Sequence, residues 1–319
     1  MRAIIQDGYG PPERLRVSHD HPDPAPGRGR ILVRVRAVSL NGSDRENLLG
    51  HPLYARVAGI RRPRNPIPGS DVAGTVAAVG SGVTAFAVGD DVLGELRGYR
   101  GGLAELVDTT PETFTRKPAD LSFVEAAALP QSGCISLAAV RGLQPGQHLL
   151  VNGAGGATGA FLIGLASHLG AEVTAADRAD KADHLRGLGA AQTIYCDRED
   201  WADGRGRYDR IIDLIADRSP RRVHPALRSG GVYRMVGGRT DLLIRLLLAG
   251  PVLRATTGKQ VGVLTVRQSG IDLAEVVSLV VAGHVRVGID SVVPFEDAST
   301  AFERLARGDH RGKIVIEVA

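Results

Sequence analysis

Residues 149–169 constrain the chain more than any other stretch, because they combine an apolar strand, a glycine turn and a helix-compatible segment. Glycine permits a tight turn, a close approach of backbone to a diphosphate and a close contact between a helix start and a strand. The first amides of the helix would then face the phosphates. The stretch predicts a dinucleotide-binding turn, although a glycine pattern alone is also compatible with an ordinary turn. The expected contacts are Gly153, Gly156, Ala157, Thr158 and Gly159.

A second apolar strand, residues 173–176, follows this helix and leads directly into an acid. Asp177 comes eighteen residues after Gly159, close to the roughly 20-residue offset at which dinucleotide-binding folds place an acid against the ribose. An aspartate there suits the two ribose hydroxyls of NADH and repels the 2′-phosphate of NADPH. Arg178 and Lys181 are close by, however, and could hold that phosphate if Asp177 turned away. These residues favour NADH only slightly.

The composition is that of an ordinary globular protein. With 319 residues, 43% hydrophobic and 23% charged, the chain has material for two domains of about 150 residues each. It shows neither an apolar run of 18 residues nor a signal-peptide pattern, and its two cysteines, Cys134 and Cys196, form no CxxC motif, so a cytoplasmic location without membrane contact is expected. The 39 basic and 35 acidic residues are interspersed, which argues against nucleic-acid binding.

The chain changes character near residue 120. The first 118 residues read as all-β, with alternating runs at 31–38 and 71–79, which predicts a barrel-like domain. A helix-compatible segment, 122–140, follows. Strands and helices then alternate, which predicts a parallel, doubly wound sheet. The expected strands are 148–152, 172–176, 192–195, 208–213, 231–236 and 261–266, and the expected helices are 160–169, 181–188 and 219–227. The tail, with a helix at 273–282 and strands near 291–294 and 313–318, is expected to fold back onto the first domain.

Eight stretches in order carry a family resemblance that spans essentially the whole chain. They are VSLNGSD (38–44), PGSDVAG (68–74), VGDDVLG (88–94), GGLAE (101–105), AAALP (126–130), the glycine turn (153–159), YDRIID (208–213) and GKIVI (312–316). Together they resemble the zinc-independent, quinone oxidoreductase-like (zeta-crystallin-like) branch of the medium-chain dehydrogenase/reductase superfamily. The resemblance implies a GroES-like β-barrel catalytic domain formed by residues 1–120 and 269–319, a Rossmann domain at 121–268, and an active site in the cleft. It also implies a homodimer paired through the last Rossmann strand.

The activity implied by the resemblance is delivery of hydride from NADPH or NADH to a quinone or an α,β-unsaturated carbonyl compound. Zinc-dependent relatives place cysteine and histidine ligands where this chain has Ser39, Asn41, Ser70 and Gln131. Without thiolate and imidazole ligands a tetrahedral zinc site cannot be assembled, so no zinc is expected. Relatives often use NADPH, whereas Asp177 favours NADH, and the cofactor stays undecided. An alcohol or carbonyl oxidoreductase and a non-catalytic nucleotide-binding protein are the alternatives.

The resemblance also assigns candidate site residues. Asn41 is expected beside the nicotinamide, and Asp44 is expected to hold its loop, although it could be a plain helix cap. Glu46 stands where relatives often carry a tyrosine, and it would be a proton donor if burial raised its pKa, or otherwise a surface residue. Tyr54 and Tyr99 are further possible donors to the substrate oxygen. The remaining candidates are Gly237, after the strand 231–236, as a cofactor contact, and Arg61, Arg62 and Arg64, which could attract an anionic substrate or carrier or be a solvated loop.

Overall fold

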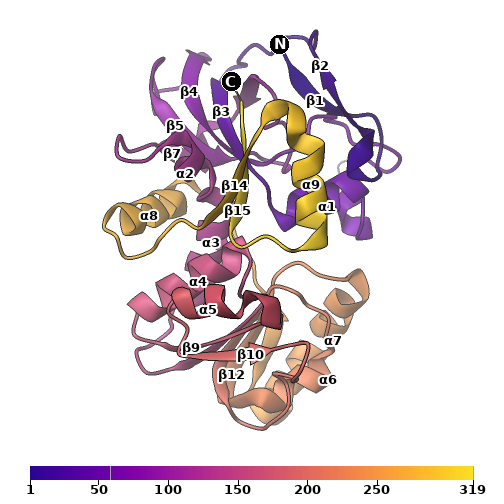
Figure 1. Cartoon of the computed structure of the whole chain (residues 1–319), viewed down its shortest axis with the longest axis vertical. Coiled ribbons are helices and arrows are strands. Elements are labelled where there is room, and N and C mark those ends of the chain that lie inside the picture. The colour runs from indigo at the N-terminus through magenta and orange to yellow at the C-terminus, as the bar shows by residue number, and fades with distance from the viewer. Residues whose placement is uncertain (58, 319) are drawn as a thin grey trace. The chain divides into compact units, whose positions relative to one another are not determined.

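The computed structural model describes residues 1–57 and 59–318, and it divides into two compact units. Unit 1 consists of Met1–Cys134, Arg267–Gly283 and Val287–Ala319, and unit 2 consists of Ile135–Val266 and His284–Arg286. The C-terminal segment therefore returns to the unit that contains the N-terminus, as Figure 1 shows by the yellow helix α9 (Ala298–Arg307) beside the strands β14 (Ile289–Pro294) and β15 (Lys313–Glu317).

Unit 2 is built on a six-stranded parallel sheet. In spatial order its strands are β10 (Gln192–Tyr195), β9 (Glu172–Asp177), β8 (His148–Asn152), β11 (Tyr208–Asp213), β12 (Leu227–Met235) and β13 (Gln260–Val263). Numbered along the chain this order is 3-2-1-4-5-6, that of the dinucleotide-binding Rossmann sheet. The predicted doubly wound parallel sheet is confirmed. Its central strands are apolar because both faces are covered, and Leu150, Ile211 and Tyr233 are fully buried.

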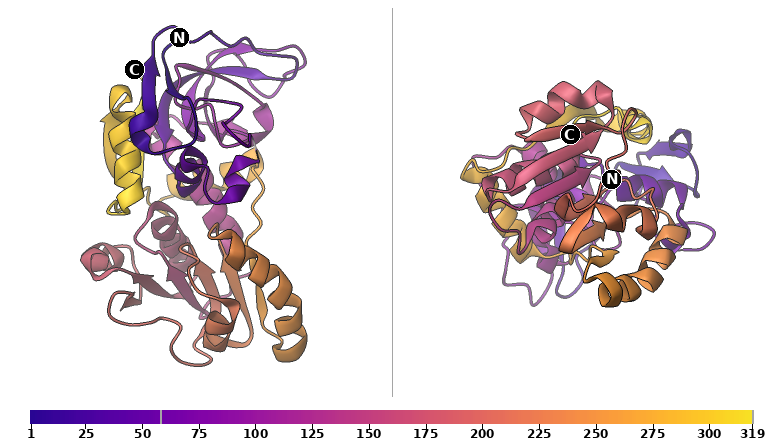
Figure 2. Two further views of the ribbon diagram at one scale, coloured as in Figure 1. Left: turned by 90° about the vertical axis from the view of Figure 1, so that its right-hand side faces the viewer. Right: turned by 90° about the horizontal axis from the view of Figure 1, so that it is seen from below.

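The helices of unit 2 precede or connect the strands of its sheet. They are the C-terminal part of α3 (Pro130–Val140), α4 (Ala157–His168), α5 (Ala182–Gly187), α6 (Pro220–Val223) and α7 (Thr240–Thr257), the last of which is the orange helix beside the sheet in Figure 2. The predicted helix 219–227 is wrong in part, because α6 gives way to a 3-10 turn at His224–Ala226 and β12 begins at Leu227. The predicted strand 261–266 ends early, at Val263.

Unit 1 contains a sheet of seven strands. Its path runs β14, β15, β3 (Ile31–Ser39), β4 (Asp71–Val79), β5 (Asp91–Glu95) and β7 (Phe114–Arg116), with β6 (Leu106–Thr109) also paired to β3. A two-stranded sheet of β1 (Ala3–Gln6) and β2 (Leu15–Ser18) accompanies it. The alternation along β3 buries Val33 and Val35 in the core and exposes Arg34 and Arg36, as expected of a strand with one buried face.

The prediction that the first 118 residues are all-β is wrong, because α1 (Gly42–Leu49) lies among them. Its sequence is mostly polar, so it has no apolar period to reveal it, and it is fixed instead by a capping box between Asn41 and Asp44. The predicted segment 122–140 is two helices, α2 (Phe123–Ala127) and α3, and the predicted helix 273–282 is α8 (Gly270–Val281).

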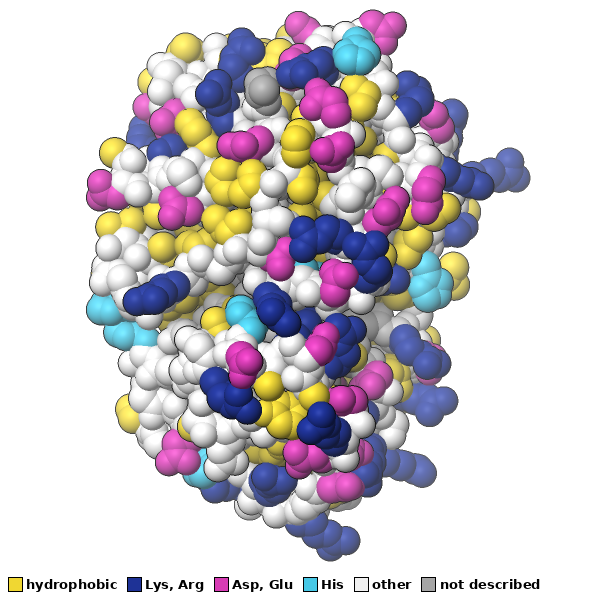
Figure 3. Space-filling view, in the orientation of Figure 1, with side chains coloured by type: hydrophobic (Ala, Val, Ile, Leu, Met, Phe, Trp, Pro, Cys, Tyr) yellow, Lys and Arg dark blue, Asp and Glu magenta, His cyan; other side chains and the backbone are white. Residues whose placement is uncertain are grey.

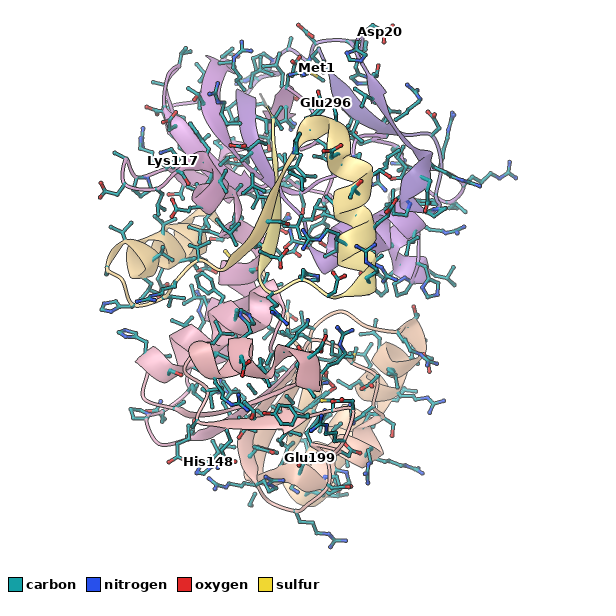
Figure 4. All side chains as sticks on the ribbon, viewed as in Figure 1. Met1, Asp20, Lys117, His148, Glu199 and Glu296 are labelled. Atoms are coloured by element: carbon teal, nitrogen blue, oxygen red, sulfur yellow. The ribbon has the colours of Figure 1, made fainter. Side chains whose placement is uncertain are left out.

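The C-terminal helix α9 was not predicted, and it packs within unit 1. Arg2, before β1, contacts both Glu105 and Glu296, and Glu296 belongs to the turn that leads into α9 (labelled in Figure 4). Acidic and basic side chains are intermixed over the face in Figure 3. In the part of the chain that the structure describes, no helix is long and apolar enough to cross a membrane.

Candidate functional site

The glycine turn of unit 2 joins the carboxyl end of β8 to the start of α4. Gly153, the first residue after β8, has φ +84°, a conformation that other L-residues rarely adopt. A Cβ added to Gly159 would lie 2.5 Å from the Cα of Ala154, so only glycine allows α4 to pack this closely against the turn. Gly153 and Gly159, two of the four glycines in this turn, are thus required by the protein's own structure.

Gly156 differs, because no contact with the described residues requires a glycine there. It is the extended N-cap of α4, and a Cβ added there would meet only the carbonyl oxygen of Gly153, at 3.8 Å. The space in front of it is open, and the first helical residues, Ala157 and Thr158, follow directly. Backbone amides at a helix start and an unfilled position beside a glycine fit a diphosphate.

Asp177 is the last residue of β9 and its carboxylate is held against this turn. One oxygen accepts a hydrogen bond from the backbone N–H of Gly155 at 2.7 Å, and the other accepts from the N–H of Arg178 at 2.8 Å. The guanidinium of Arg178 contacts Asp180 at 2.8 Å. Lys181 is buried, with its side chain so close to Gly155 that a Cβ there would lie 2.5 Å from it. The predicted acid and lysine are therefore brought to the glycine turn.

A buried hydrogen-bonded network occupies the neighbouring strand ends and was not predicted. Asp213, at the end of β11, accepts bonds from the side chains of Asn152, at 2.7 Å, and Tyr233, at 2.9 Å. It also accepts from the N–H of Ala216, whose φ is +55°. The strand order reverses between β8 and β11, and open α/β sheets bind ligands at this point. Gly237, with φ +66°, follows β12 at the same edge.

The candidate residues of unit 1 lie at the start of α1. The N–H of Asn41 donates to a carboxylate oxygen of Asp44 at 2.8 Å, and the same oxygen accepts from the hydroxyl of Ser70 at 3.2 Å. The side-chain amide of Asn41 donates to Ser70 at 3.3 Å. All three side chains are buried. Asp44 therefore takes part in the capping box of α1 and, through the same carboxylate, holds the loop that contains Asn41.

A buried lysine, which was not predicted, connects this group to two further acids. The ammonium of Lys313, the first residue of β15, lies 2.5 Å from the side-chain oxygen of Asn41 and 3.1 Å from a carboxylate oxygen of Asp71. That carboxylate oxygen also accepts the N–H of Gln131, at 3.1 Å, and the side-chain amide of Gln131 donates to Glu95 at 2.6 Å. The hydroxyl of Ser39 donates to the same oxygen of Asp71 at 3.5 Å. We call these residues the Lys313 cluster; its members are Ser39, Asn41, Asp44, Ser70, Asp71, Glu95, Gln131 and Lys313.

The Lys313 cluster contains three buried carboxyl groups and one cation. Burial and the charge of Asp71 raise the pKa of Asp44 to about 7, against the opposing effects of its hydrogen bonds and of Lys313. Burial and the same neighbour raise the pKa of Glu95 to about 8. Burying unbalanced charge is costly, so such groups hold their protons instead. Asp44 and Glu95 are therefore expected to be largely protonated near neutral pH.

Glu46 and Tyr54 form a separate pair in unit 1. The hydroxyl of Tyr54 donates to the Glu46 carboxylate at 3.0 Å, and both side chains are half-buried. Burial raises the pKa of Glu46, and burial with the Glu46 charge raises the pKa of Tyr54. Because residues two apart on a helix point to different sides, Glu46 leaves α1 on another side than Asp44.

The arginines of the segment after α1 are surface residues in the structure. Arg61, Arg62 and Arg64 are all exposed.

Tyr99 is 38% exposed and has φ +57°, which is unusual for a residue with a side chain. One sequence signal could have marked Lys313, Asp71 and Glu95, because each is a charged residue at one end of a strand whose interior is mostly apolar.

Comparison with known families agrees with both units. An alcohol dehydrogenase GroES-like domain profile matches residues 27–119, and a zinc-binding dehydrogenase profile matches residues 188–316. A chloroplast envelope quinone oxidoreductase homolog of Arabidopsis thaliana is 30% identical over 338 residues, which cover 99% of this chain and 98% of that protein. The chain belongs to the quinone oxidoreductase-like branch of the medium-chain dehydrogenase/reductase superfamily.

Two further relatives extend this family assignment. The 2-methylene-furan-3-one reductase of Solanum lycopersicum is 27% identical over 329 residues, covering 99% of this chain and 79% of that protein. The solved structure of the quinone oxidoreductase from Coxiella burnetii has a TM-score of 0.88 and 29% identity, covering 100% of this chain and 99% of that one. The predicted GroES-like and Rossmann architecture is confirmed, and the chain is an oxidoreductase of this family.

Proposed function

We propose that the protein uses NADH to reduce a quinone or an α,β-unsaturated carbonyl compound, without a metal ion. The observation that carries this proposal is the position of Lys313. Its ammonium contacts Asn41 and, with the N–H of Gln131, the carboxylate of Asp71. Zinc-dependent relatives use the Asn41 and Gln131 region for metal ligands, whereas here a lysine supplies the positive charge.

A lysine ammonium cannot replace zinc as a Lewis acid for an alcohol. Zinc polarises a bound oxygen directly, but this ammonium is fully engaged with buried partners, its side chain being 2% exposed. A conjugated carbonyl substrate needs less help, because its own oxygen accepts the negative charge as hydride is added. The names of the Arabidopsis and Coxiella relatives are consistent with quinone substrates, and that of the tomato relative with an enone.

The geometry around Asp177 supports NADH over NADPH. Two backbone amides fix its carboxylate, so the side chain is not free to turn away from an adenosine ribose. A 2′-phosphate placed there would meet a negative charge, while two ribose hydroxyls could donate to it. Arg178 pairs with Asp180, which leaves the arginine less available to hold a phosphate.

When bound, reduced nicotinamide supplies a hydride to an electron-poor carbon of the substrate. In unit 2 the glycine turn, the first amides of α4 and Asp177 would hold the adenosine diphosphate part. In unit 1 the side chain of Asn41 is fixed by Lys313 on its oxygen and by Ser70 on its nitrogen, at 2.5 and 3.3 Å. Such fixed orientation is what positioning of a reacting ring requires.

The test is turnover with purified protein after treatment with a strong chelator. Oxidation of NADH by a panel of quinones and enones, unaffected by the chelator, is expected. Loss of activity in the chelator with recovery on zinc addition would refute metal independence. Calorimetric binding of NADH without turnover on any acceptor would instead indicate a non-catalytic nucleotide-binding protein.

A further inference from the structure

Two carboxyl groups of the Lys313 cluster face each other across paired strands. Asp71 and Glu95 are direct partners in the antiparallel pairing of β4 with β5. Their residues are 0% and 7% exposed. Like charges at opposite positions of a strand pair are unfavourable, and burial strengthens their repulsion. The two side chains therefore cannot both be ionised without a large cost.

The surrounding groups decide which carboxyl keeps its proton. Lys313 contacts the carboxylate of Asp71, which also accepts the N–H of Gln131. Glu95 instead receives a neutral amide donor, Gln131, at 2.6 Å. The cation thus lies against Asp71, while burial and the neighbouring Asp71 favour the neutral form of Glu95 against the effect of its amide donor.

Three further groups interact with Glu95. Asp44 of α1 adds negative charge, and Gln268, in the segment before α8, adds a second amide donor; the two amide donors oppose the rise in the pKa of Glu95. Burial and the charge of Glu95 raise the pKa of Tyr99, in the turn after β5. Burial and the two aspartates together raise the pKa of Glu95 to about 8, so this geometry leaves a neutral carboxylic acid inside unit 1 at physiological pH.

We propose that Glu95 is the proton donor of the reduction, an inference that rests on the reductase activity proposed above. Hydride addition would break a C–H bond of the reduced nicotinamide, which becomes oxidised, and form a C–H bond at the electron-poor carbon, while the electron pair of the substrate double bond moves to its oxygen. The O–H bond of Glu95 then breaks and its proton adds to that oxygen, giving an enol, or to the α-carbon, giving the saturated ketone. With a quinone, the keto form produced in this way becomes the quinol by enolisation. The resulting carboxylate keeps the hydrogen bond of Gln131 and takes a new proton from solvent.

The Lys313 cluster favours Glu95 over the pair of Glu46 and Tyr54 for this role. Glu95 is connected through Gln131, Asp71 and Lys313 to Asn41, the residue expected beside the nicotinamide. In the other pair, burial raises the pKa of Glu46 against the hydrogen bond of Tyr54 and the charge of Arg45, whereas at Glu95 two neighbouring aspartates add to the effect of burial. The contact with Glu46 also opposes proton release from Tyr54. An acid held neutral is the better donor.

The decisive comparison is between Glu95→Gln and the matched surface variant Glu112→Gln, whose side chain is 62% exposed in the native chain. Removing a general acid is expected to lower kcat by about 10²-fold or more, with the Kd for NADH unchanged. Glu112→Gln is expected to match the native protein. Glu95→Gln activity within about threefold of native would overturn the proposal.

The pH profile of the native protein provides a test that does not depend on a variant folding. The kcat is expected to fall as the pH rises through about 8 and the donor loses its proton. Glu95→Gln is expected to lose this alkaline limb, and Glu95→Asp, which keeps a carboxylic acid, is expected to retain one. A native kcat that stays flat from about pH 7 to about pH 9 would contradict the role of Glu95.

Failure of this inference can be distinguished from failure of the proposed function. If the native protein oxidises NADH with no quinone or enone, the reductase activity itself is wrong. If the native protein is active and Glu95→Gln keeps both its rate and its alkaline limb, only the role of Glu95 is wrong.

Deuterated NADH separates hydride transfer from proton transfer. A smaller primary isotope effect on kcat is expected in Glu95→Gln, because proton transfer would limit the rate of that variant.

Discussion

The carboxylate of Asp177 accepts a hydrogen bond from the backbone N–H of Gly155 at 2.7 Å, and this bond fastens the end of β9 to the turn after β8. The two residues are 22 positions apart in the chain. The acid that would face the ribose therefore also shapes the turn that would face the diphosphate. Changes at Asp177 are expected to affect both cofactor choice and the order of the turn.

Asp177→Ser is expected to shift cofactor preference towards NADPH. The change removes a negative charge and leaves Arg178 and Lys181 able to approach a 2′-phosphate. A swing of about 1–3 kcal/mol, roughly 5- to 150-fold in the ratio of kcat/KM values, is the scale expected when one charge-assisted hydrogen bond forms and one repulsion disappears. Arg178→Ala in the serine background should reverse part of the shift. A change below about threefold for Asp177→Ser would show that other residues determine the choice.

Gly156→Val is expected to weaken cofactor binding while leaving the fold intact. The added side chain would enter the open space in front of the turn, where only the carbonyl oxygen of Gly153 lies within 4 Å of a new Cβ. Gly187→Val is the matched control, because a Cβ there also meets open space, but at the end of α5. Calorimetry should show weaker NADH binding for Gly156→Val alone, with thermal melting like that of the control. Equal affinity of both variants would remove the turn from the binding site.

Lys313→Met is expected to destabilise unit 1 by about 3–5 kcal/mol, because it leaves the buried carboxylate of Asp71 without its cation. Asp71 is 0% exposed and its other oxygen has no hydrogen-bond partner among the described residues. Adding Asp71→Asn to the lysine variant should recover at least half of the loss, since the unpaired charge is then gone. Denaturant unfolding of the native protein, both single variants and the double variant measures this coupling. Additive effects would show that the ion pair contributes little.

The free energy of unfolding is expected to fall as the pH rises from about 5 to about 8. Burial raises the pKa of Glu95 from its ordinary 4.5 to about 8, and that of Asp44 from 3.8 to about 7. Between those values the folded state binds more protons than the unfolded state, so stability is fully present below the unfolded pKa and is lost as the pH rises through the folded one. Chemical unfolding at several pH values should show a loss on the order of a few kcal/mol. In Glu95→Gln about half of this loss should vanish, because Asp44 still titrates between the same limits; an unchanged slope would mean that Glu95 is ionised throughout.

Much of the fold could be predicted because unit 2 has strong local signals. The strands β8, β10 and β11 begin and end where the apolar runs and flanking turns place them. Helix α1 was missed because polar residues dominate it, and α7 was not recognised because Gly250 and Pro251 lie inside it. Helix α9 was overlooked although it carries a helical period, since Ala298, Ala301, Phe302 and Leu305 pack on the core of unit 1.

The candidate site was predictable only where its residues are close in sequence. The glycine turn and Asp177 belong to one β-α-β unit with a known spacing. Lys313 and Asn41 are 272 positions apart, and their contact depends on β15 pairing with β3, with Val315 opposite Ser39. No local pattern specifies that pairing. Asp71 and Glu95 likewise face each other only because of the register between β4 and β5. The raised pKa of Glu95 could therefore not be inferred from the sequence.

We expect the protein to form a homodimer through the β13 edge of unit 2. In the described chain β13 ends the sheet, with β12 as its neighbour, and an unpaired apolar edge strand is a surface that proteins usually cover. The adjacent helix α7 packs on β13 and exposes Ile244, Leu247, Leu248 and Val252 by 53 to 72%. Leu248→Lys should therefore lower the mass measured by light scattering from dimer to monomer. Leu53→Lys, at an equally exposed leucine of unit 1, should leave the dimer intact. A native protein that is monomeric at micromolar concentration would refute the dimer, and dissociation by Leu53→Lys instead would place its interface on unit 1.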